Sequence, residues 1–230
     1  MKIVRWWKRA LAALLLLVLL WQGWYLGWVV WWKYVDPGST SFMTQRLDAL
    51  REKKPAADLR YRWVPYAKIS RHLKHAVVAA EDDKFIDHEG FDWEGMQKAL
   101  EKNRKKGKVV AGGSTISQQL AKNLFLSASK TPWRKAQEAV ITVWLEALWD
   151  KRRILEVYLN VVEWGEGVFG AEAAATRYFR TTAAGLNAEQ AARLAVLLPA
   201  PRKYEKNPYS AYLNARTQSI LARMQYSEVP

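Results

Sequence analysis

The sequence contains no cysteine and only three histidines, which narrows the kinds of site it can hold. Without cysteine the fold cannot rely on disulfide bonds, a pattern compatible with an exported domain. The histidines form no His-x-x-x-His pair, so a dedicated zinc site is not expected. The acidic residues around His88 do not match a calcium-binding EF-hand loop, because their spacing is wrong and the central glycine is absent.

Regular alternation of polar and apolar residues is also nearly absent, whereas apolar residues recur at helical spacing along most of the chain. From about residue 45 onward, the sequence therefore predicts one all-α domain with enough apolar residues for a single sizeable core. The spacing predicts helices over residues 69–82, 92–103, 115–125, 132–149, 152–160, 168–178, 188–197 and 209–225.

Charged side chains are missing from Ala10 to Trp32, where Gln22 is the only strongly polar residue. At about 1.5 Å per residue this run spans about 35 Å, enough to cross a hydrocarbon layer of about 30 Å. A cleaved signal peptide would need a shorter apolar core and an Ala-x-Ala-like step, which is not found here, so we expect an uncleaved anchor. The cations that precede the run place the N-terminus in the cytoplasm by the positive-inside rule; they are Lys2, Arg5, Lys8 and Arg9.

The net charge is +14, and removing the four N-terminal cations leaves about +10 on the remainder. A basic domain held beside a membrane points to anionic lipid headgroups or a phosphate-bearing substrate. Nucleic acid is not an expected partner, because the chain carries a membrane anchor and lacks zinc-finger and RNP-type patterns.

Glu81 stands at the end of the apolar run Ala76–Ala80, within a predicted helix. A carboxylate at the mouth of an apolar segment has a raised pKa, which suits a general base near neutral pH. A charge that merely flanks a helix explains the same position. The nearby His88 could act either as a metal ligand or as a structural hydrogen-bonding group. We expect the second role.

Two glycines, Gly112 and Gly113, precede a hydroxyl-rich helix start in which Thr115 and Gln118 fit a capping box. This arrangement exposes backbone N–H groups at the positive end of a helix, where phosphate binds readily, and Lys122 adds a cation. A P-loop is excluded because the Lys-Ser/Thr pair is missing. A well-capped glycine turn without any ligand is the alternative.

Arg134 and Glu138 are four residues apart and therefore share one helix face. They form either a surface ion pair of small energetic value or a cation and a second carboxylate presented to one cleft.

In order, these motifs resemble the signature blocks of the peptidoglycan glycosyltransferases. The blocks are Glu81-Asp82-x-x-Phe85-x-x-His88-x-Gly90, Gly112 to Asn123, Arg134-Lys135-x-x-Glu138, Ile154 to Asn160, and Gly165 to Phe179. The resemblance covers about residues 65–208. It is strongest to the monofunctional, membrane-anchored members, since the sequence leaves no room for a transpeptidase domain, and no transpeptidase activity is expected.

The resemblance implies an all-α, lysozyme-like fold with a large lobe and a small membrane-facing jaw. It also implies polymerisation of lipid II into glycan strands by inverting β-1,4 transfer, with release of undecaprenyl diphosphate. The expected organisation is a cytoplasmic tail over 1–9, a transmembrane helix over 10–32, a linker and the start of the jaw over 33–60, and the glycosyltransferase domain over 61–230.

The resemblance assigns Glu81 as the general base and Glu138 as a second catalytic carboxylate. The diphosphate would be bound by Lys122, Lys130, Arg134 and Lys135. The walls of the cleft would include Ser114, Thr115, Gln118, Gln119 and Asn123, and the site would be supported by Asp82, Phe85, His88 and Gly90.

The implied partners are lipid II, the growing lipid-linked glycan, the bacterial inner membrane and other cell-wall synthesis proteins, with the domain on the periplasmic side. No cofactor is required, although Mg²⁺ or Mn²⁺ assists diphosphate binding in some relatives. Two alternatives stay open, a lysozyme-like glycosidase with two carboxylates and a non-catalytic membrane-tethered scaffold. A diphosphate leaving group needs cations more than it needs a proton donor, whereas a glycosidase needs a carboxylic acid to protonate its leaving oxygen. The cations Lys122 and Arg134 therefore favour the transferase.

Aromatic residues beside cations predict which part of the jaw meets the membrane. The aromatic residues are Phe85, Phe91 and Trp93; Met96 belongs to the same set, and the basic stretch Lys102–Lys108 follows. A buried aromatic cluster is the alternative. The basic stretch is expected to be mobile, because a glycine among like charges disfavours a helix.

Overall fold

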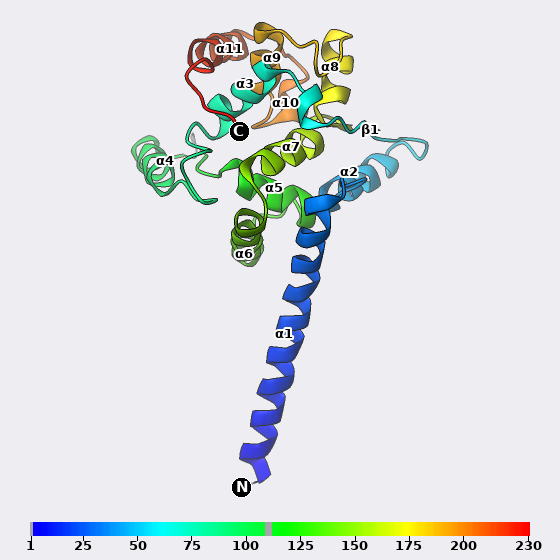
Figure 1. Ribbon diagram of the computed structural model, residues 1–230, viewed down its shortest axis with the longest axis vertical. Coiled ribbons are helices and arrows are strands. Elements are labelled where there is room, and N and C mark those ends of the chain that lie inside the picture. Colours follow the sequence, from blue (N-terminus) through cyan, green and yellow to red (C-terminus); the bar gives the residue numbers. More distant parts are fainter. Residues whose placement is uncertain (1, 109–111) are drawn as a thin grey trace.

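The structure is a computed structural model that describes residues 2–108 and 112–230. One long helix, α1 (Lys2–Tyr34), extends from a helical domain and carries the N-terminus at its far end (Figure 1). Among the described residues, only this helix is long and apolar enough to cross a membrane, over Trp6–Tyr34. The anchor predicted for residues 10–32 is therefore one uninterrupted helix that continues at both ends.

The predicted all-α class is confirmed, and the predicted helices are present with ends shifted by a few residues. They are α3 (Arg71–Glu81), α4 (Trp93–Lys106), α5 (Ile116–Phe125), α6 (Pro132–Leu148), α7 (Lys151–Val161), α8 (Ala171–Phe179), α9 (Ala188–Ala195) and α11 (Ala211–Arg223). The start of α8 is later than predicted because Val168 and Phe169 are in a strand, and Gly170 then turns the chain with a φ of 82°.

A further helix, α2 (Ser41–Arg51), lies in the segment that the sequence suggested was a linker. Thr40 caps it by accepting a hydrogen bond from the Met43 N–H at 3.2 Å, and Phe42 and Met43 are buried. The other elements that were not predicted are too short to show a periodic pattern. They are β1 (Arg60–Tyr61), the 3-10 turn η1 (Tyr66–Lys68), β2 (Glu163–Gly165), β3 (Val168–Phe169) and α10 (Pro201–Tyr204).

The strands form one small sheet in the order β1-β3-β2, with β1 parallel and β2 antiparallel to β3. Elsewhere in the domain α3 packs against α9, while α5 packs against both α6 and α7. In Figure 1, α5 and α6 lie on the side of the domain nearest α1, and α8, α9 and α11 lie on the opposite side. Four of the five sequence motifs therefore lie on α3, α5, α6 and α7 and the turns beside them, whereas the fifth covers β3 and α8.

The structure contradicts the membrane contact predicted for Phe85 and the absence of a helix expected for the basic stretch. Phe85 is completely buried and therefore does not face a membrane. Its ring centroid lies 6.4 Å from that of His88 and 4.7 Å from Lys151 Nζ. The helix α4 continues through most of the basic stretch, and Gly107 ends it with a φ of 62°. Gly107 acts as a left-handed cap, and the cations of the last turn interact favourably with the helix dipole.

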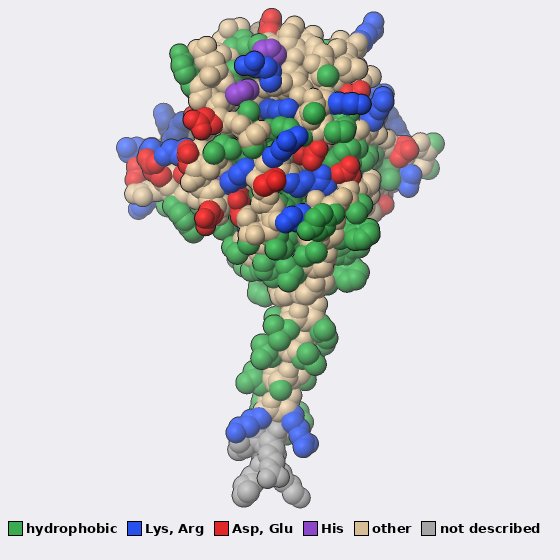
Figure 2. All heavy atoms as spheres, in the orientation of Figure 1, with side chains coloured by type: hydrophobic (Ala, Val, Ile, Leu, Met, Phe, Trp, Pro, Cys, Tyr) green, Lys and Arg blue, Asp and Glu red, His purple; other side chains and the backbone are tan. Residues whose placement is uncertain are grey.

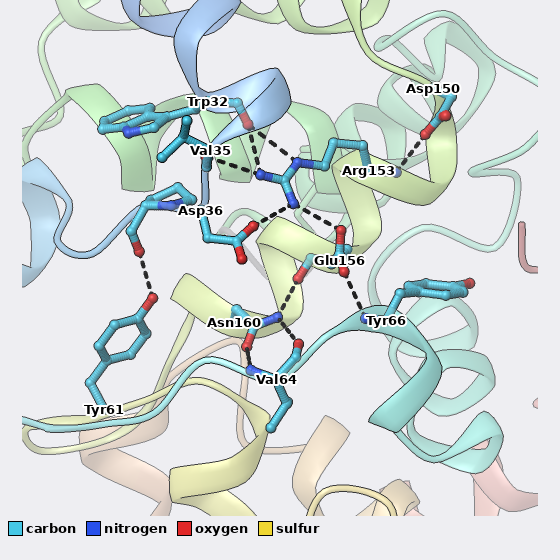
Figure 3. Close-up of polar contacts among 11 residues, drawn as sticks. Trp32, Val35, Asp36, Tyr61, Val64, Tyr66, Asp150, Arg153, Glu156 and Asn160 are labelled. Atoms are coloured by element: carbon cyan, nitrogen blue, oxygen red, sulfur yellow. Dashed lines mark hydrogen bonds and ion pairs between the residues drawn. The ribbon is translucent and has the colours of Figure 1, made fainter.

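Arg153 of α7 fastens the end of the anchor to the domain (Figure 3). Its guanidinium donates to the backbone oxygen of Trp32 at 2.8 Å and to that of Val35 at 3.1 Å. It also pairs with Asp36 at 2.8 Å and Glu156 at 2.9 Å. Because the last carbonyl groups of a helix lack partners within the helix, this arginine serves as a C-terminal cap from another part of the chain.

Candidate active site

Glu81 is the last residue of α3, and its position depends on how that helix is built. Ser70 caps the start of α3 by accepting a hydrogen bond from the His72 N–H at 3.2 Å, and the buried face of the helix packs on α9. The helix ends at Asp82, whose backbone departs from helical geometry. Glu81 is therefore held at the edge of the core, where the residue is partly exposed and lines a hollow.

A chain of hydrogen bonds fixes the Glu81 carboxylate. The Gln119 amide nitrogen donates to Glu81 Oε2 at 2.8 Å, and the Tyr158 hydroxyl donates to Gln119 Oε1 at 3.0 Å. Tyr158 is completely buried, and burial keeps its pKa well above the ordinary value of 10.0, so the hydroxyl remains a donor. The sequence predicted Gln119 as a site residue but gave Tyr158 no role.

Burial raises the pKa of Glu81 above its ordinary value of 4.5. The hydrogen bond from Gln119 and the charges of Arg216 and Lys122 act in the opposite direction but do not cancel the effect of burial. A carboxylate with a raised pKa that remains accessible can accept a proton from a substrate near neutral pH.

The turn after Glu81 is held by Asp82 and His88. One oxygen of Asp82 accepts from the N–H of Ile116, the first residue of α5, at 2.9 Å, and the other lies 2.8 Å from His88 Nε2. His88 Nδ1 accepts from the Gly90 N–H at 3.1 Å, so the proton of the neutral ring is on Nε2 and is donated to Asp82. These contacts place His88 as a hydrogen-bonding group that joins the turn to α5.

Thr115 and Gln118 form the expected capping box at the start of α5. Thr115 also donates to the backbone oxygen of Gly90 at 2.7 Å. Both side chains are almost fully buried, and Gln118 contributes to neither hollow described below. The amide oxygen of Gln118 is used to cap the helix, since it accepts a hydrogen bond from the Thr115 N–H at 3.1 Å.

Replacing Asp82 with asparagine should lower the free energy of unfolding by about 1–3 kcal/mol, because a buried charged acceptor shared by two donors is lost. Thermal unfolding would measure this loss. Asp87→Asn is the matched control. Asp87 lies in the same turn but is exposed, so this substitution should change the free energy of unfolding little. Equal effects of the two substitutions would show that Asp82 does not hold the turn.

A hollow of about 560 Å³ lies beside α5 and α6 and is lined by all four predicted cations. The buried carboxylate of Glu138 pairs with Arg134 Nη1 at 2.6 Å and with Lys135, and Lys135 also donates to Ser114 Oγ at 3.2 Å. The cations that line it include Lys122, Lys130, Arg134 and Lys135, and Gln119 and Asn123 line the same cleft.

Burial lowers the pKa of Lys122 below its ordinary value of 10.5; the charge of Glu138 opposes this effect and that of Arg134 adds to it. Three cations around a single carboxylate leave an excess of positive charge in the cleft. An anion that enters this space would compensate that charge.

Glu81 and the cationic cleft are neighbours. A smaller hollow of about 180 Å³ is lined by Glu81, Asp82 and Gly113, and Ser114 contributes to both hollows. Gln119 contributes to the larger hollow and donates to Glu81. The arrangement can therefore hold an anionic group in one hollow and a proton donor next to Glu81 in the other.

Several cleft residues were not identified from the sequence. Phe42 and Arg46 come from α2, Arg46 pairs with the buried Glu163 at 3.1 Å, and Arg202 lines the cleft from α10. The Thr40 cap followed by two apolar residues could have revealed α2. Nothing local in the sequence indicates that α2 folds back onto the cleft.

Among the described residues, no group of three or more Asp, Glu or His side chains converges in a way that could hold a metal ion. A cation in this cleft would depend largely on oxygen atoms of the bound substrate.

Comparison with known proteins agrees with the motifs. A family model described as Transglycosylase matches residues 48–225. The chain is 65% identical over 226 residues to a protein named biosynthetic peptidoglycan transglycosylase from Azoarcus sp. (strain BH72), covering 98% of this chain and 97% of the relative. A protein of the same name from Dechloromonas aromatica (strain RCB) is 61% identical, and the match covers 100% of both chains. Another from Chromobacterium violaceum is 57% identical, and the match covers 96% of this chain and 97% of the relative. The chain therefore belongs to the transglycosylase family and is a glycosyltransferase, as the ordered motifs predicted.

Proposed function

We propose that this protein polymerises lipid II into linear glycan strands for the peptidoglycan of the bacterial cell wall. The reaction is an inverting β-1,4 transfer in which the growing lipid-linked chain is the donor and lipid II is the acceptor. The observation that supports this best is the adjacency of Glu81, a carboxylate with a raised pKa, to a cleft rich in cations.

In this mechanism Glu81 accepts the proton of the 4-hydroxyl of lipid II. The hydroxyl oxygen forms a bond to the anomeric carbon of the donor, and the bond from that carbon to the diphosphate oxygen breaks. Undecaprenyl diphosphate leaves with the electron pair. Gln119 keeps the carboxylate of Glu81 turned toward the acceptor, since its donor nitrogen lies 2.8 Å away.

The cations of the cleft stabilise the negative charge that grows on the diphosphate as this bond breaks. Arg134 and Lys135 are held by Glu138, so they are already oriented before the substrate arrives. Lys130 is exposed on the rim and meets the diphosphate as a mobile point charge. A bound Mg²⁺ or Mn²⁺ would add to the positive charge of these residues.

The apolar helix α1 fits a single-pass inner-membrane protein. With the basic tail in the cytoplasm, the domain lies on the periplasmic side, where its substrates are displayed by the outer leaflet. The anchor therefore keeps the cleft close to lipid-linked substrates, a requirement that a hydrolase of finished glycan does not share.

Detergent-solubilised full-length protein should consume purified lipid II and release polymer, and a phosphoglycolipid inhibitor such as moenomycin should block this activity. Release of reducing ends from finished glycan without consumption of lipid II would instead identify a glycosidase. Binding of either substrate without turnover would indicate a non-catalytic scaffold.

A further inference from the structure

The anchor packs along the domain over the second half of its length. Trp21 stacks on Trp133 of α6 with ring centroids 6.0 Å apart, and Tyr25 meets Phe125 of α5 edge-on at 5.7 Å. Further along, the indole N–H of Trp149 donates to the backbone oxygen of Val29 at 2.9 Å. The anchor and the helices of the cleft thus share a continuous interface.

At the end of this interface nearest the N-terminus, two glutamines form a reciprocal pair. Gln22 Nε2 donates to Gln137 Oε1 at 2.9 Å, and Gln137 Nε2 donates to Gln22 Oε1 at 3.2 Å. Gln137 is buried, with only 5% of its surface exposed. Gln22 is also the single strongly polar side chain of the apolar run, so the anchor carries one polar group and the domain satisfies it.

The pair lies at a depth that belongs to the bilayer. Gln22 follows Arg9, the last cation before the apolar run, by about 20 Å of helix, whereas the hydrocarbon layer is about 30 Å thick. On α6, the apolar residues Trp133, Val140 and Val143 are exposed, and Trp133 stacks on Trp21 of the anchor. Figure 2 shows apolar side chains gathered on the underside of the domain around α1, with charged side chains above them.

The same helix that receives Gln22 also carries the cations of the cleft. Gln137 immediately precedes Glu138, and Arg134 and Lys135 lie one turn earlier. A contact that fixes Gln137 relative to the anchor therefore fixes the height of the cleft relative to the lipid headgroups. Because the proposed donor is held by its lipid, that height decides whether its diphosphate reaches the cations.

We propose that Gln22 and Gln137 form a clamp inside the bilayer and are positioning residues for transfer from a membrane-bound donor. The inference rests on the proposed function. In hydrocarbon an unpaired amide has no water to bond to, so the two side chains select this one register of the anchor on α6.

The test uses the full-length protein in lipid vesicles with Gln22→Leu, Gln137→Leu, the double variant and Gln218→Leu, an exposed control on α11. Each single variant leaves one amide unpaired and should lower kcat/KM for vesicle-bound lipid II about 3- to 20-fold. The double variant leaves no amide unpaired and should lose less than the two single losses combined. Detergent micelles contain no bilayer that fixes the height of the cleft relative to the lipid headgroups. The decrease in kcat/KM should therefore be smaller in micelles than in vesicles. Losses of equal size in both media would show a purely structural role and overturn the proposal.

A rescue experiment separates the clamp from general stability. The chain has no cysteine, so Gln22→Cys with Gln137→Cys introduces a unique pair. A short bis-maleimide that joins the two positions should restore vesicle activity toward the wild-type rate, and crosslinking without any recovery would refute the clamp. Wild-type protein run in parallel distinguishes the two hypotheses, because its failure to polymerise lipid II would refute the proposed function instead.

Discussion

Glu81→Gln is expected to abolish polymerisation of lipid II without making the protein less stable. Loss of the proton acceptor should slow the reaction about 100- to 10,000-fold, the usual contribution of general base catalysis. The amide oxygen of glutamine can still accept the hydrogen bond from Gln119, so the packing of the site is preserved. The rate of lipid II consumption measures the first effect, and Glu89→Gln, an exposed neighbour, is the matched control.

The stability half of this prediction follows from the raised pKa of Glu81. The folded state holds this proton more tightly than the unfolded state, so the free energy of unfolding decreases as pH rises from 4.5 through the raised value. Glutamine carries no charge and escapes that loss, so the variant should melt at the same temperature as the wild type or higher at pH 8. The difference should vanish at pH 4. Wild-type activity should fall as pH decreases through the same range, since a protonated Glu81 cannot act as a base.

A variant that melts clearly earlier than the wild type at pH 8 would contradict this account of burial. Full activity of the variant would remove Glu81 from the mechanism altogether.

Glu138→Gln is expected to have the opposite effect on stability. Glu138 is buried between Arg134 and Lys135, and its charge also compensates Lys122. Without it, three neighbouring cations repel one another, and the free energy of unfolding should fall by about 2 kcal/mol, a value reduced by the partial exposure of Lys135. The rate should fall about 100-fold, because the cations are no longer oriented toward the leaving group.

The matched control is Glu94→Gln. Glu94 also contacts two lysines, Lys84 and Lys98, but all three side chains are largely exposed, so this change should hardly affect stability. Inorganic pyrophosphate should raise the melting temperature of Glu138→Gln more than that of the wild type, since the anion replaces the missing charge. Equal shifts would show that Glu138 does not compensate the cations that bind the anion.

Local sequence was sufficient to predict the parts of the site that depend on a single helix or turn. The apolar run before Glu81, the capping box at Thr115 and the four-residue spacing of Arg134 and Glu138 each express a short-range rule, and the structure shows the corresponding local geometry. The catalytic and binding roles assigned to these residues stay predictions, which the experiments above would test.

The unpredicted features depend on contacts between distant parts of the chain. Gln22 and Gln137 are separated by 115 positions, and nothing near either residue specifies the other. Arg46 reaches the cleft only because α2 folds back onto α5. The jaw prediction failed at Phe85 for a related reason, since an aromatic residue looks the same in sequence whether it faces lipid or the core.

The attachment of α7 to the end of the anchor has a consequence for the enzyme in membranes of different thickness. Arg153 binds the backbone oxygens of Trp32 and Val35 and the carboxylate of Asp36 at once, which ties the end of α1 to the domain. A transmembrane helix responds to a thinner bilayer by tilting. Because the anchor and the domain are joined in this way, such a tilt would incline the mouth of the cleft as well, so the lipid composition of the membrane becomes a determinant of how the enzyme faces its substrate.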